Sequence, residues 1–452
     1  MRVGRCGKIN RMNQPSFDIA TSATQRVSRA LEDATTGAAQ HVFTQLYADA
    51  ALATAHECDA AQQAGRSLGV LQGMCITLKD NFDVAGETTL AGSAVCAGET
   101  PAQRDALVVQ RLRDAGAVLL GKTNMSEFAF SGVGINPHYG TPANPADTVH
   151  ARVPGGSSSG AAMSVALGLA QAGIGTDTGG SIRIPAALCG LVGFKSTQAR
   201  VPCKGVMELS RSLDTVGSIT RSVRACLQVD AVMSQQPLPT DAADLRGLRF
   251  AVPQTLMMDE ADATVAQAFE RALQRIAEAG AEVVHIPFMG LGEIAALSMP
   301  AGFSPIEGYA AHHLRLARGA DRMDPRVVAR MTLGKGISAQ DYLELHNRRN
   351  AWIADAEQTL HGFDAMLCPT VPIVAPLIEP LLKDDDAFFK VNRLLLRNPS
   401  AINYMNGCSW SLPCHAAGEL PVGLMVSSVA GQDADLARVA LALEALLKPL
   451  HS

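Results

Sequence analysis

The chain has 452 residues, of which 47% are hydrophobic and 18% charged, and this balance is typical of a globular enzyme and excludes an intrinsically disordered chain. The net charge of −5 and the aromatic content of 4% argue against a basic or base-stacking surface for nucleic acid. No segment approaches the roughly 18 consecutive apolar residues of a membrane span, so we expect a soluble cytoplasmic protein with neither nucleic acid nor a membrane as partner.

Two further features bear on the cellular setting. Residues 1–15 carry several cations and no acid, and they lack the apolar centre of a secretory signal. We expect a disordered extension here, or translation that begins at Met12. The ten cysteines are scattered without a Cys-x-x-Cys pair, which predicts buried reduced thiols and no local metal site. No metal and no cofactor are expected.

The first half of the chain alternates apolar runs with Ala-rich or amphipathic segments. Residues 132–157 are rich in Gly, Pro and Asn and are predicted to form a loop. The pattern predicts, in chain order, a helix over 40–64, a strand over 74–78, a helix over 105–116, a strand over 117–120, the start of a helix within 123–130 and a helix over 161–173.

The second half continues the alternation after a polar surface excursion over 228–247. The predicted elements are a strand over 248–252, helix 262–279, strand 281–286, helix 338–360, strands 364–369 and 422–426, and helix 434–447. Nothing in the excursion has the clear character of a linker between domains. We therefore expect a single large α/β domain with a mixed, twisted β-sheet covered by helices on both faces.

One segment matches the sequence pattern of a nucleotide-binding motif but lacks the structural setting that the motif requires. Residues 116–123, "GAVLLGKT", fit the G-x-x-x-x-G-K-[ST] pattern of the phosphate-binding loop. In that loop a strand precedes the motif, and the four intervening residues supply amides to phosphate. Here those residues are apolar and are themselves predicted to be the strand. The motif is interpreted as accidental.

The segment "GGSSSG" at 155–160 has three interpretations. It is either a flexible linker, the G-x-S-x-G elbow of a serine hydrolase centred on Ser158, or part of another catalytic arrangement. The elbow requires a sharp turn between a strand and a helix, and the preceding "VHARVPG" is a poor strand. None of the eleven histidines is an obvious base for Ser158.

Two other segments carry candidate chemistry. Lys79 ends an apolar run, so its amine is either partly buried or extends along the surface. Ser181 follows Gly179 and Gly180 at a predicted junction of loop and helix. Consecutive glycines let backbone amides converge on one point, as an oxyanion hole requires, although a tight turn with a capping serine has the same sequence.

A family resemblance decides between these interpretations. The segment 155–195, "GGSSSGAAMSVALGLAQAGIGTDTGGSIRIPAALCGLVGFK", is similar to the defining segment of the amidase signature family. The similarity extends to "GMCITLKDNFDVAGETTLAGS", "GAVLLGKTNMSEFAF", "GTPANP" and "LPVGLMVSSVAGQDADLARVALALE". It implies an amidase domain over residues 16–452 with the amidase signature fold.

By position, the resemblance places the family's Ser–cis-Ser–Lys triad on Ser181, Ser157 and Lys79. Ser181 is then the acylated nucleophile, and Ser157, which follows a cis peptide bond, relays protons to a neutral Lys79. The backbone amides of Thr178, Gly179 and Gly180, together with that of Ser181 itself, are expected to hold the oxyanion.

The resemblance also suggests residues around the triad. Arg183 is a candidate for binding an acidic substrate group, and a salt bridge within the fold is the alternative. Asp177 is expected to brace its loop as a hydrogen-bond acceptor. Ser159 replaces a common glycine of the family, which raises the question of a restricted φ there. Ala129 and Phe130 are candidate substrate contacts.

The expected activity is hydrolysis of a small-molecule carboxamide to a carboxylate and ammonia or an amine. The alternative is the glutaminase (A-type) subunit of a tRNA-dependent amidotransferase complex. The acyl pocket is expected in the segments 126–140, 203–215 and 290–410, whose larger side chains include Phe128, Phe130, Met207, Phe303 and Tyr404. Homodimers occur in this family, and such an assembly is one expectation here.

Overall fold

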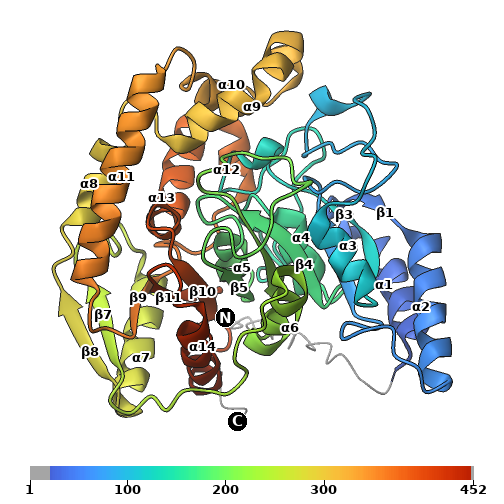
Figure 1. Cartoon of the computed structure of the whole chain (residues 1–452), viewed down its shortest axis with the longest axis horizontal. Helices are drawn as coiled ribbons and strands as arrows, with labels where there is room; N and C mark the ends of the chain where they lie inside the picture. The colour runs from blue at the N-terminus through green and yellow to red at the C-terminus, as the bar shows by residue number, and fades with distance from the viewer. Residues whose placement is uncertain (1–20, 449–452) are drawn as a thin grey trace, which may run out of the picture.

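One eleven-stranded sheet forms the centre of the molecule in this computed structural model, which describes residues 21–448. The expected extension over residues 1–15 lies outside that range. Along the sheet the strand order is β1-β3-β2-β4-β6-β5-β10-β11-β9-β7-β8, with β8 and β1 at opposite ends (Figure 1). The strands are β1 (Phe43–Leu46), β2 (Cys75–Lys79), β3 (Val118–Thr123), β4 (Ala172–Asp177), β5 (Val192–Lys195), β6 (Thr215–Thr220), β7 (Arg249–Pro253), β8 (Glu282–Ile286), β9 (Ala365–Pro369), β10 (Cys408–Pro413) and β11 (Gly423–Ser428).

The sheet is mixed, as the sequence predicts. Strands β3, β2 and β4 run parallel in one part, and β9, β7 and β8 run parallel in another. The strands between them pair antiparallel, from β4 through β6, β5, β10 and β11 to β9. The predicted β-α-β unit is present, because α7 (Ala263–Glu278) connects the parallel strands β7 and β8.

Helices cover both faces of the sheet, which confirms the predicted fold class. Alternating side chains show the two faces within one strand: Leu367 of β9 packs in one apolar cluster, and Met366 packs in another on the opposite face. The first face carries α3 (Leu107–Asp114), α6 (Val223–Ser234), α7 and α14 (Asp433–Leu447). The second carries α1 (Ala23–Ala34), α2 (Ala48–Gln63), α4 (Ser159–Ala166), α5 (Arg183–Leu188), α8 (Gly290–Leu297), α11 (Ala339–Thr359) and α13 (Asp385–Tyr404).

Three more helices lie beyond the sheet. Helices α9 (Phe303–Gly319) and α10 (Pro325–Thr332) pack against each other at the top of the view in Figure 1. Helix α12 (Ile378–Lys383) packs against α13. The sequence patterns gave bounds for none of these helices, and α9 and α10 become important because they border the cavity described below.

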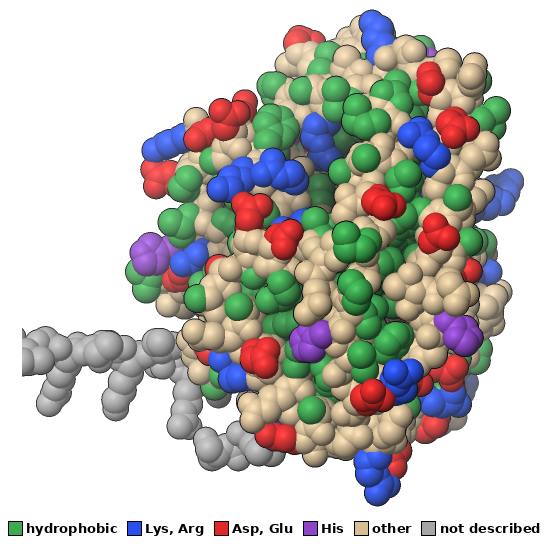
Figure 2. All heavy atoms as spheres, turned by 90° about the vertical axis from the view of Figure 1, so that its left-hand side faces the viewer, with side chains coloured by type: hydrophobic (Ala, Val, Ile, Leu, Met, Phe, Trp, Pro, Cys, Tyr) green, Lys and Arg blue, Asp and Glu red, His purple; other side chains and the backbone are tan. Residues whose placement is uncertain are grey.

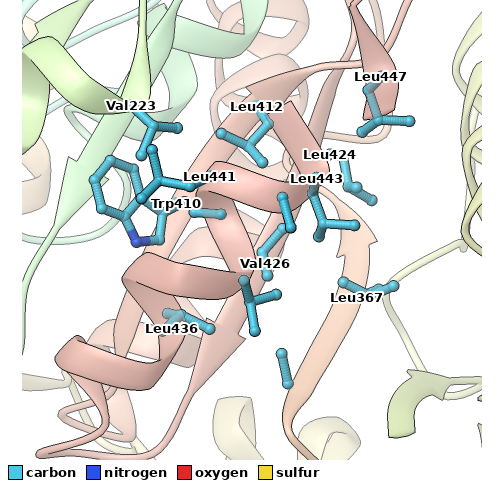
Figure 3. Packing of buried hydrophobic residues seen from close by; sticks show 14 of the residues in the cluster. Val223, Leu367, Trp410, Leu412, Leu424, Val426, Leu436, Leu441, Leu443 and Leu447 are labelled. Carbon is cyan, nitrogen blue, oxygen red and sulfur yellow. The ribbon is translucent and has the colours of Figure 1, made fainter. Parts of the chain in front are cut away.

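The largest apolar cluster lies between α14 and the strands beneath it (Figure 3). Trp410 of β10 is fully buried and stacks on Phe194 of β5 with ring centroids 4.0 Å apart. The side chains around it come from helices and strands that are far apart in the sequence: Val223, Leu367, Leu412, Leu424, Val426, Leu436, Leu441, Leu443 and Leu447. This packing fixes the antiparallel part of the sheet.

Four predicted elements differ from the structure. The helix predicted over 161–173 ends at Ala166, and residues 172 and 173 already belong to β4. The Ala-rich helix predicted over 40–64 begins only at Ala48, because 43–46 pairs with β3 as β1. The excursion predicted over 228–247 begins after Ser234, since α6 extends to that residue. The helix predicted within 123–130 is absent: only a short 3₁₀ turn forms there, because Phe128 and Ala129 adopt left-handed backbone angles, with φ of 50° and 60°.

The structure also rules out the phosphate-binding loop at 116–123. Residues 118–123 form β3, so Lys122 lies within a strand of the sheet. Its side chain is buried and its Nζ lies 3.6 Å from Asp80 Oδ1. No loop of free amides exists at this place, and the motif is accidental.

The thiols and the surface complete the description of the fold. The nine cysteines among the described residues are free, and six of them are buried. Cys203 is exposed, so the prediction of buried thiols is wrong for that residue. Side chains of both charges are scattered over the face shown in Figure 2. From residue 21 to residue 448, no helix combines the length and apolarity needed to cross a membrane.

Candidate active site

The structure brings the three segments that contain Lys79, Ser157 and Ser181 together. Lys79 is the last residue of β2, which pairs in parallel with β4. Ser157 precedes α4, and Ser181 lies between β4 and α5. The backbone N–H of Ser158 donates to the carbonyl of Ser181 at 3.3 Å, which joins the second and third segments directly.

Close packing between α4 and β4 makes this arrangement possible. A Cβ atom on Gly173 would lie 2.4 Å from the carbonyl oxygen of Ala161, and one on Gly175 would lie 2.6 Å from Ser158 Oγ. Both distances are shorter than real carbon contacts, so only glycine fits. The glycines that weaken the strand character of 172–177 therefore allow the start of α4 to rest on the sheet.

Lys79 is fully buried and hydrogen-bonded. Its Nζ lies 2.7 Å from Ser157 Oγ and 2.7 Å from Thr176 Oγ1. Burial lowers the pKa of Lys79 to about 7, and the nearby carboxylates of Asp214 and Asp177 limit the decrease. The amine can therefore exchange a proton near neutral pH.

The two serines differ in their exposure to the cavity. The peptide bond between Gly156 and Ser157 is cis, as the resemblance implies. Ser157 is buried and does not line the cavity, whereas Ser181 does. The buried hydroxyl of Ser157 thus contacts the lysine, and Ser181 is the serine that a bound molecule can reach.

Asp177 organises the loop that carries Ser181. Its carboxylate accepts hydrogen bonds from the backbone N–H of Gly180 at 2.8 Å and of Ile182 at 3.2 Å, and Asn403 donates to it at 2.8 Å. Burial tends to raise the pKa of Asp177, but the Arg183 guanidinium outweighs this effect and holds the pKa well below its usual range. Asp177 therefore braces the loop, as predicted.

Arg183 belongs to the same network and not to the cavity. The side chain is fully buried, and its Nε and Nη2 lie 3.0 Å from the two carboxylate oxygens of Asp177. Nη2 also donates to Asn403 Oδ1 at 2.6 Å. The expectation that Arg183 binds an acidic substrate group is wrong for this structure, because the fold already occupies its guanidinium in a salt bridge.

The backbone amides before Ser181 are not equivalent. The N–H of Gly180 donates to the Asp177 carboxylate, so it is not free to hold an oxyanion. The prediction that Gly180 belongs to the oxyanion hole is therefore wrong. Within the described residues, no hydrogen bond uses the amides of Thr178, Gly179 or Ser181 as donors. These three amides are the unoccupied donors beside the Ser181 hydroxyl.

Ser158 and Ser159 have supporting positions. The Ser158 hydroxyl is buried and donates to the Thr176 carbonyl at 3.3 Å. Ser159 begins α4 and donates to the Asn124 carbonyl at 3.2 Å. Ser159 is not among the residues with positive φ, so the serine at this position causes no backbone strain.

Asp214 is a residue near the triad that sequence reasoning missed. The Thr178 hydroxyl donates to its Oδ1, and the amides of Leu209 and Ser210 donate to Oδ2 at 2.9 and 3.1 Å. Burial raises the pKa of Asp214 to about 6. No local motif distinguishes this aspartate, since its role depends on the fold that brings it near Lys79.

A cavity of about 280 Å³ opens next to Ser181. It contains the expected Ala129 and Phe130, while Phe128 and Met207 do not line it. Its walls are Ala129, Phe130, Ser131, Thr178, Gly179, Ser181, Leu209, Leu213, Ile294, Ser298, Ala301, Gly302, Phe303, Ser304, Pro305, Arg330, Leu396, Ser400 and Tyr404. All of them except the loop around Ser181 come from the three segments expected to form the pocket. Among the described side chains, no three metal-ligating groups gather at any point.

Comparison with known proteins places this site in a family. The family model for amidases matches residues 25–437. 2-Amino-5-chloromuconic acid deaminase of Comamonas testosteroni is 35% identical over 402 residues, which cover 87% of this chain and 86% of that protein. The A-type subunit of the glutamyl-tRNA(Gln) amidotransferase of Acidothermus cellulolyticus is 35% identical over 467 residues, which cover 94% and 91%.

The fold agrees with the sequence comparison. The crystal structure of an amidase matches with a TM-score of 0.85 at 31% identity, and the match covers 94% of this chain and 96% of that one. The chain therefore belongs to the amidase family and is an amidase, an enzyme that hydrolyses amide C–N bonds.

Proposed function

We propose that the chain hydrolyses a small-molecule carboxamide through an acyl-enzyme on Ser181. Lys79 in its neutral form takes a proton from Ser157, which takes one from Ser181 as that oxygen attacks the amide carbon. The relay then returns a proton to the leaving nitrogen as the C–N bond breaks. Water attacks the resulting ester and releases the carboxylic acid.

The observation that carries this proposal is the 2.7 Å contact between Lys79 Nζ and Ser157 Oγ. A neutral amine has one lone pair and two hydrogens, so it can accept the Ser157 proton while it donates to Thr176. The pKa of about 7 makes this neutral form available near physiological pH. A surface lysine would stay charged and could not act as a base.

The free amides support the electrostatic part of the proposal. We propose that the N–H groups of Thr178, Gly179 and Ser181 stabilise the negative charge on the carbonyl oxygen. Removal of one such donor in a serine hydrolase costs about 2.7–4 kcal/mol of transition-state stabilisation. Gly180 is left out, because its N–H already binds Asp177.

Substitution tests the assignment. On a panel of aliphatic, aromatic and amino-acid amides, we expect Ser181→Ala, Ser157→Ala and Lys79→Ala each to abolish turnover and to leave the fold intact by circular dichroism. Ser159→Ala is the matched control, since it removes a neighbouring hydroxyl whose hydrogen bond goes to the Asn124 carbonyl and not to the triad. Substantial turnover by Ser181→Ala would overturn the mechanism.

A second candidate function follows from the relative of Acidothermus cellulolyticus, which aligns with 94% of this chain. In that case the chain is the glutaminase component of a tRNA-dependent amidotransferase and passes ammonia to a partner. Glutaminase activity that appears only with the partner proteins would favour this function. Efficient hydrolysis of simple amides by the isolated chain would favour the first.

A further inference from the structure

Arg330 is the single charged side chain among the residues that line the cavity. It lies in the last turn of α10. No aspartate or glutamate lines the same cavity in the described part of the chain. The cavity therefore has a positive charge on its wall and no negative charge to balance it.

The contacts of Arg330 leave most of its donors unused. One N–H donates to the carbonyl of Phe130, and the guanidinium carbon lies 4.7 Å from the centre of the Phe130 ring. Among the described residues, no carboxylate forms an ion pair with it. Burial lowers the pKa of Arg330 to about 10, and no acidic group offsets that effect.

Neighbouring arginines behave differently. Arg315 and Arg318 of α9 both form ion pairs with Glu99, and Arg326 of α10 pairs with Asp324. Arg330 is partly buried, and a partly desolvated charge gains most from a partner of opposite charge. Within residues 21–448 no acidic side chain pairs with it, so its remaining donors are available to a molecule bound in the cavity.

A structural role for Arg330 does not account for this geometry. A cation near a helix C-terminus is favourable in itself. However, one N–H group of Arg330 donates to the carbonyl of Phe130. That residue belongs to another segment and lines the cavity together with Ser181. The contact fixes the guanidinium at the cavity wall, where its planar fork can bind a carboxylate through two hydrogen bonds.

We propose that Arg330 binds a carboxylate at the far end of the substrate, so that the enzyme hydrolyses the monoamide of a small dicarboxylic acid. This inference rests on the proposed amidase function at Ser181. The Ser181 oxygen attacks the amide carbon, the C–N bond breaks and ammonia leaves, and water then hydrolyses the acyl-enzyme ester to release the dicarboxylate. The reaction that supplies the substrate must therefore form an amide on one of two carboxyl groups. The volume of about 280 Å³ suits short acids.

The test compares two substrates that differ only in charge. Succinamate carries the carboxylate, and levulinamide has a methyl group in place of one carboxylate oxygen. Malonamate and glutaramate are measured beside succinamate, and the best of the three anionic amides is compared with levulinamide. We expect the wild-type kcat/KM for that anionic amide to exceed the value for levulinamide by about tenfold or more, because a charged hydrogen bond is lost with the neutral amide. Arg330→Gln should remove this preference, so that the ratio of kcat/KM for the anionic amide to kcat/KM for levulinamide falls to about one.

Two further variants separate charge from packing. Arg330→Lys keeps the charge without the planar fork, so an intermediate preference is expected. Arg322→Gln removes an exposed arginine that does not line the cavity, and it should retain the full preference. A purely structural role of Arg330 would instead lower kcat/KM for both substrates by the same factor, which would contradict the inference.

The failure of this inference can be distinguished from the failure of the proposed function. Equal kcat/KM for anionic and neutral amides, with Ser181 required for both, would overturn the carboxylate site and leave the mechanism standing. Absence of all turnover would count against the mechanism. In that case, calorimetry of succinamate and glutaramate binding to Ser181→Ala tests the carboxylate site. Binding of succinamate or glutaramate that Arg330→Gln abolishes would support it, and no binding of either would contradict it.

Discussion

At the scale of single residues, Lys79 governs how the site responds to pH. Burial lowers the pKa of Lys79 to about 7, while Asp214 and Asp177 act in the opposite direction. Because the neutral amine is the active form, the active fraction grows as pH increases through that value. We predict that kcat/KM falls on the acid side with an apparent pKa of about 7.

Asp214→Asn should move the acidic limb of the kcat/KM profile, where kcat/KM falls, to lower pH. The substitution removes a negative charge that raises the pKa of Lys79. The asparagine oxygen can accept either from the Thr178 hydroxyl or from the Leu209 and Ser210 amides, but not from both. The measurement is the pH profile of kcat/KM, with the exposed Asp241→Asn as control. A limb that stays in place or moves to higher pH would show that Asp214 does not influence Lys79.

The two arginines near Ser181 should differ in their effect on stability. Arg183→Gln leaves the buried carboxylate of Asp177 without its ion pair, which is expected to lower the free energy of unfolding by about 3–5 kcal/mol. Arg330→Gln leaves no carboxylate unpaired and should have a much smaller effect. Denaturant unfolding of both variants measures the difference, and equal losses would contradict the distinction.

The sequence led to Lys79, Ser157 and Ser181 because family resemblance fixes them by position. It left Arg183 with two interpretations, a contact to an acidic substrate group or a salt bridge within the fold, and the structure has the salt bridge with Asp177. Arg330 and Asp214 were missed because neither residue belongs to a motif that the resemblance locates. Both lie in segments expected to form the pocket, but only the folded chain shows that Arg330 lines the cavity and that Asp214 lies near Lys79.

At the scale of elements, the contact between α4 and β4 positions Ser157 relative to Lys79. Gly173→Ala would place a Cβ atom 2.4 Å from the Ala161 carbonyl, and such overpacking costs about 1–3 kcal/mol. We predict this loss of stability by denaturant unfolding, together with a lower kcat. Gly37→Ala is the control, since no atom lies within 4 Å of a Cβ atom at that glycine. An unchanged Gly173→Ala variant would contradict the close packing.

Local patterns predicted elements well where apolar periodicity was strong. The strands over 248–252 and 281–286 and the helix between them are present within a residue or two. The patterns failed at 172–177, where glycines required by α4 hide a strand, and at 123–130, where left-handed backbone replaces the expected helix. In both places close packing around the site outweighs local propensity.

At the scale of the whole molecule, one sheet connects the parts of the chain that build the site. Leu424 of β11 is fully buried in the cluster of Figure 3. We predict that Leu424→Ala lowers the free energy of unfolding by about 2–5 kcal/mol, whereas Leu343→Ala, at an exposed position on α11, changes it little. Chemical denaturation followed by fluorescence and circular dichroism provides the measurement, and similar values for the two variants would contradict this description of the core.

The alternation of strands and helices was enough to predict a large α/β fold with a mixed sheet. The strand order was not predictable, because it depends on pairings such as β5 with β10 that join distant segments. For the same reason the cavity could be assigned to three segments but not to particular walls. Helices α9 and α10, whose bounds no pattern gave, supply Phe303 and Arg330.

The central claim is that Ser181 is the nucleophile, activated through Ser157 by Lys79. The most direct measurement is peptide mass spectrometry after treatment with a fluorophosphonate, with Lys79→Ala treated in parallel. We predict a single adduct on Ser181 in the wild-type enzyme and greatly slowed labelling in the variant. An adduct on Ser158, or labelling of Ser181 that does not depend on Lys79, would contradict this assignment.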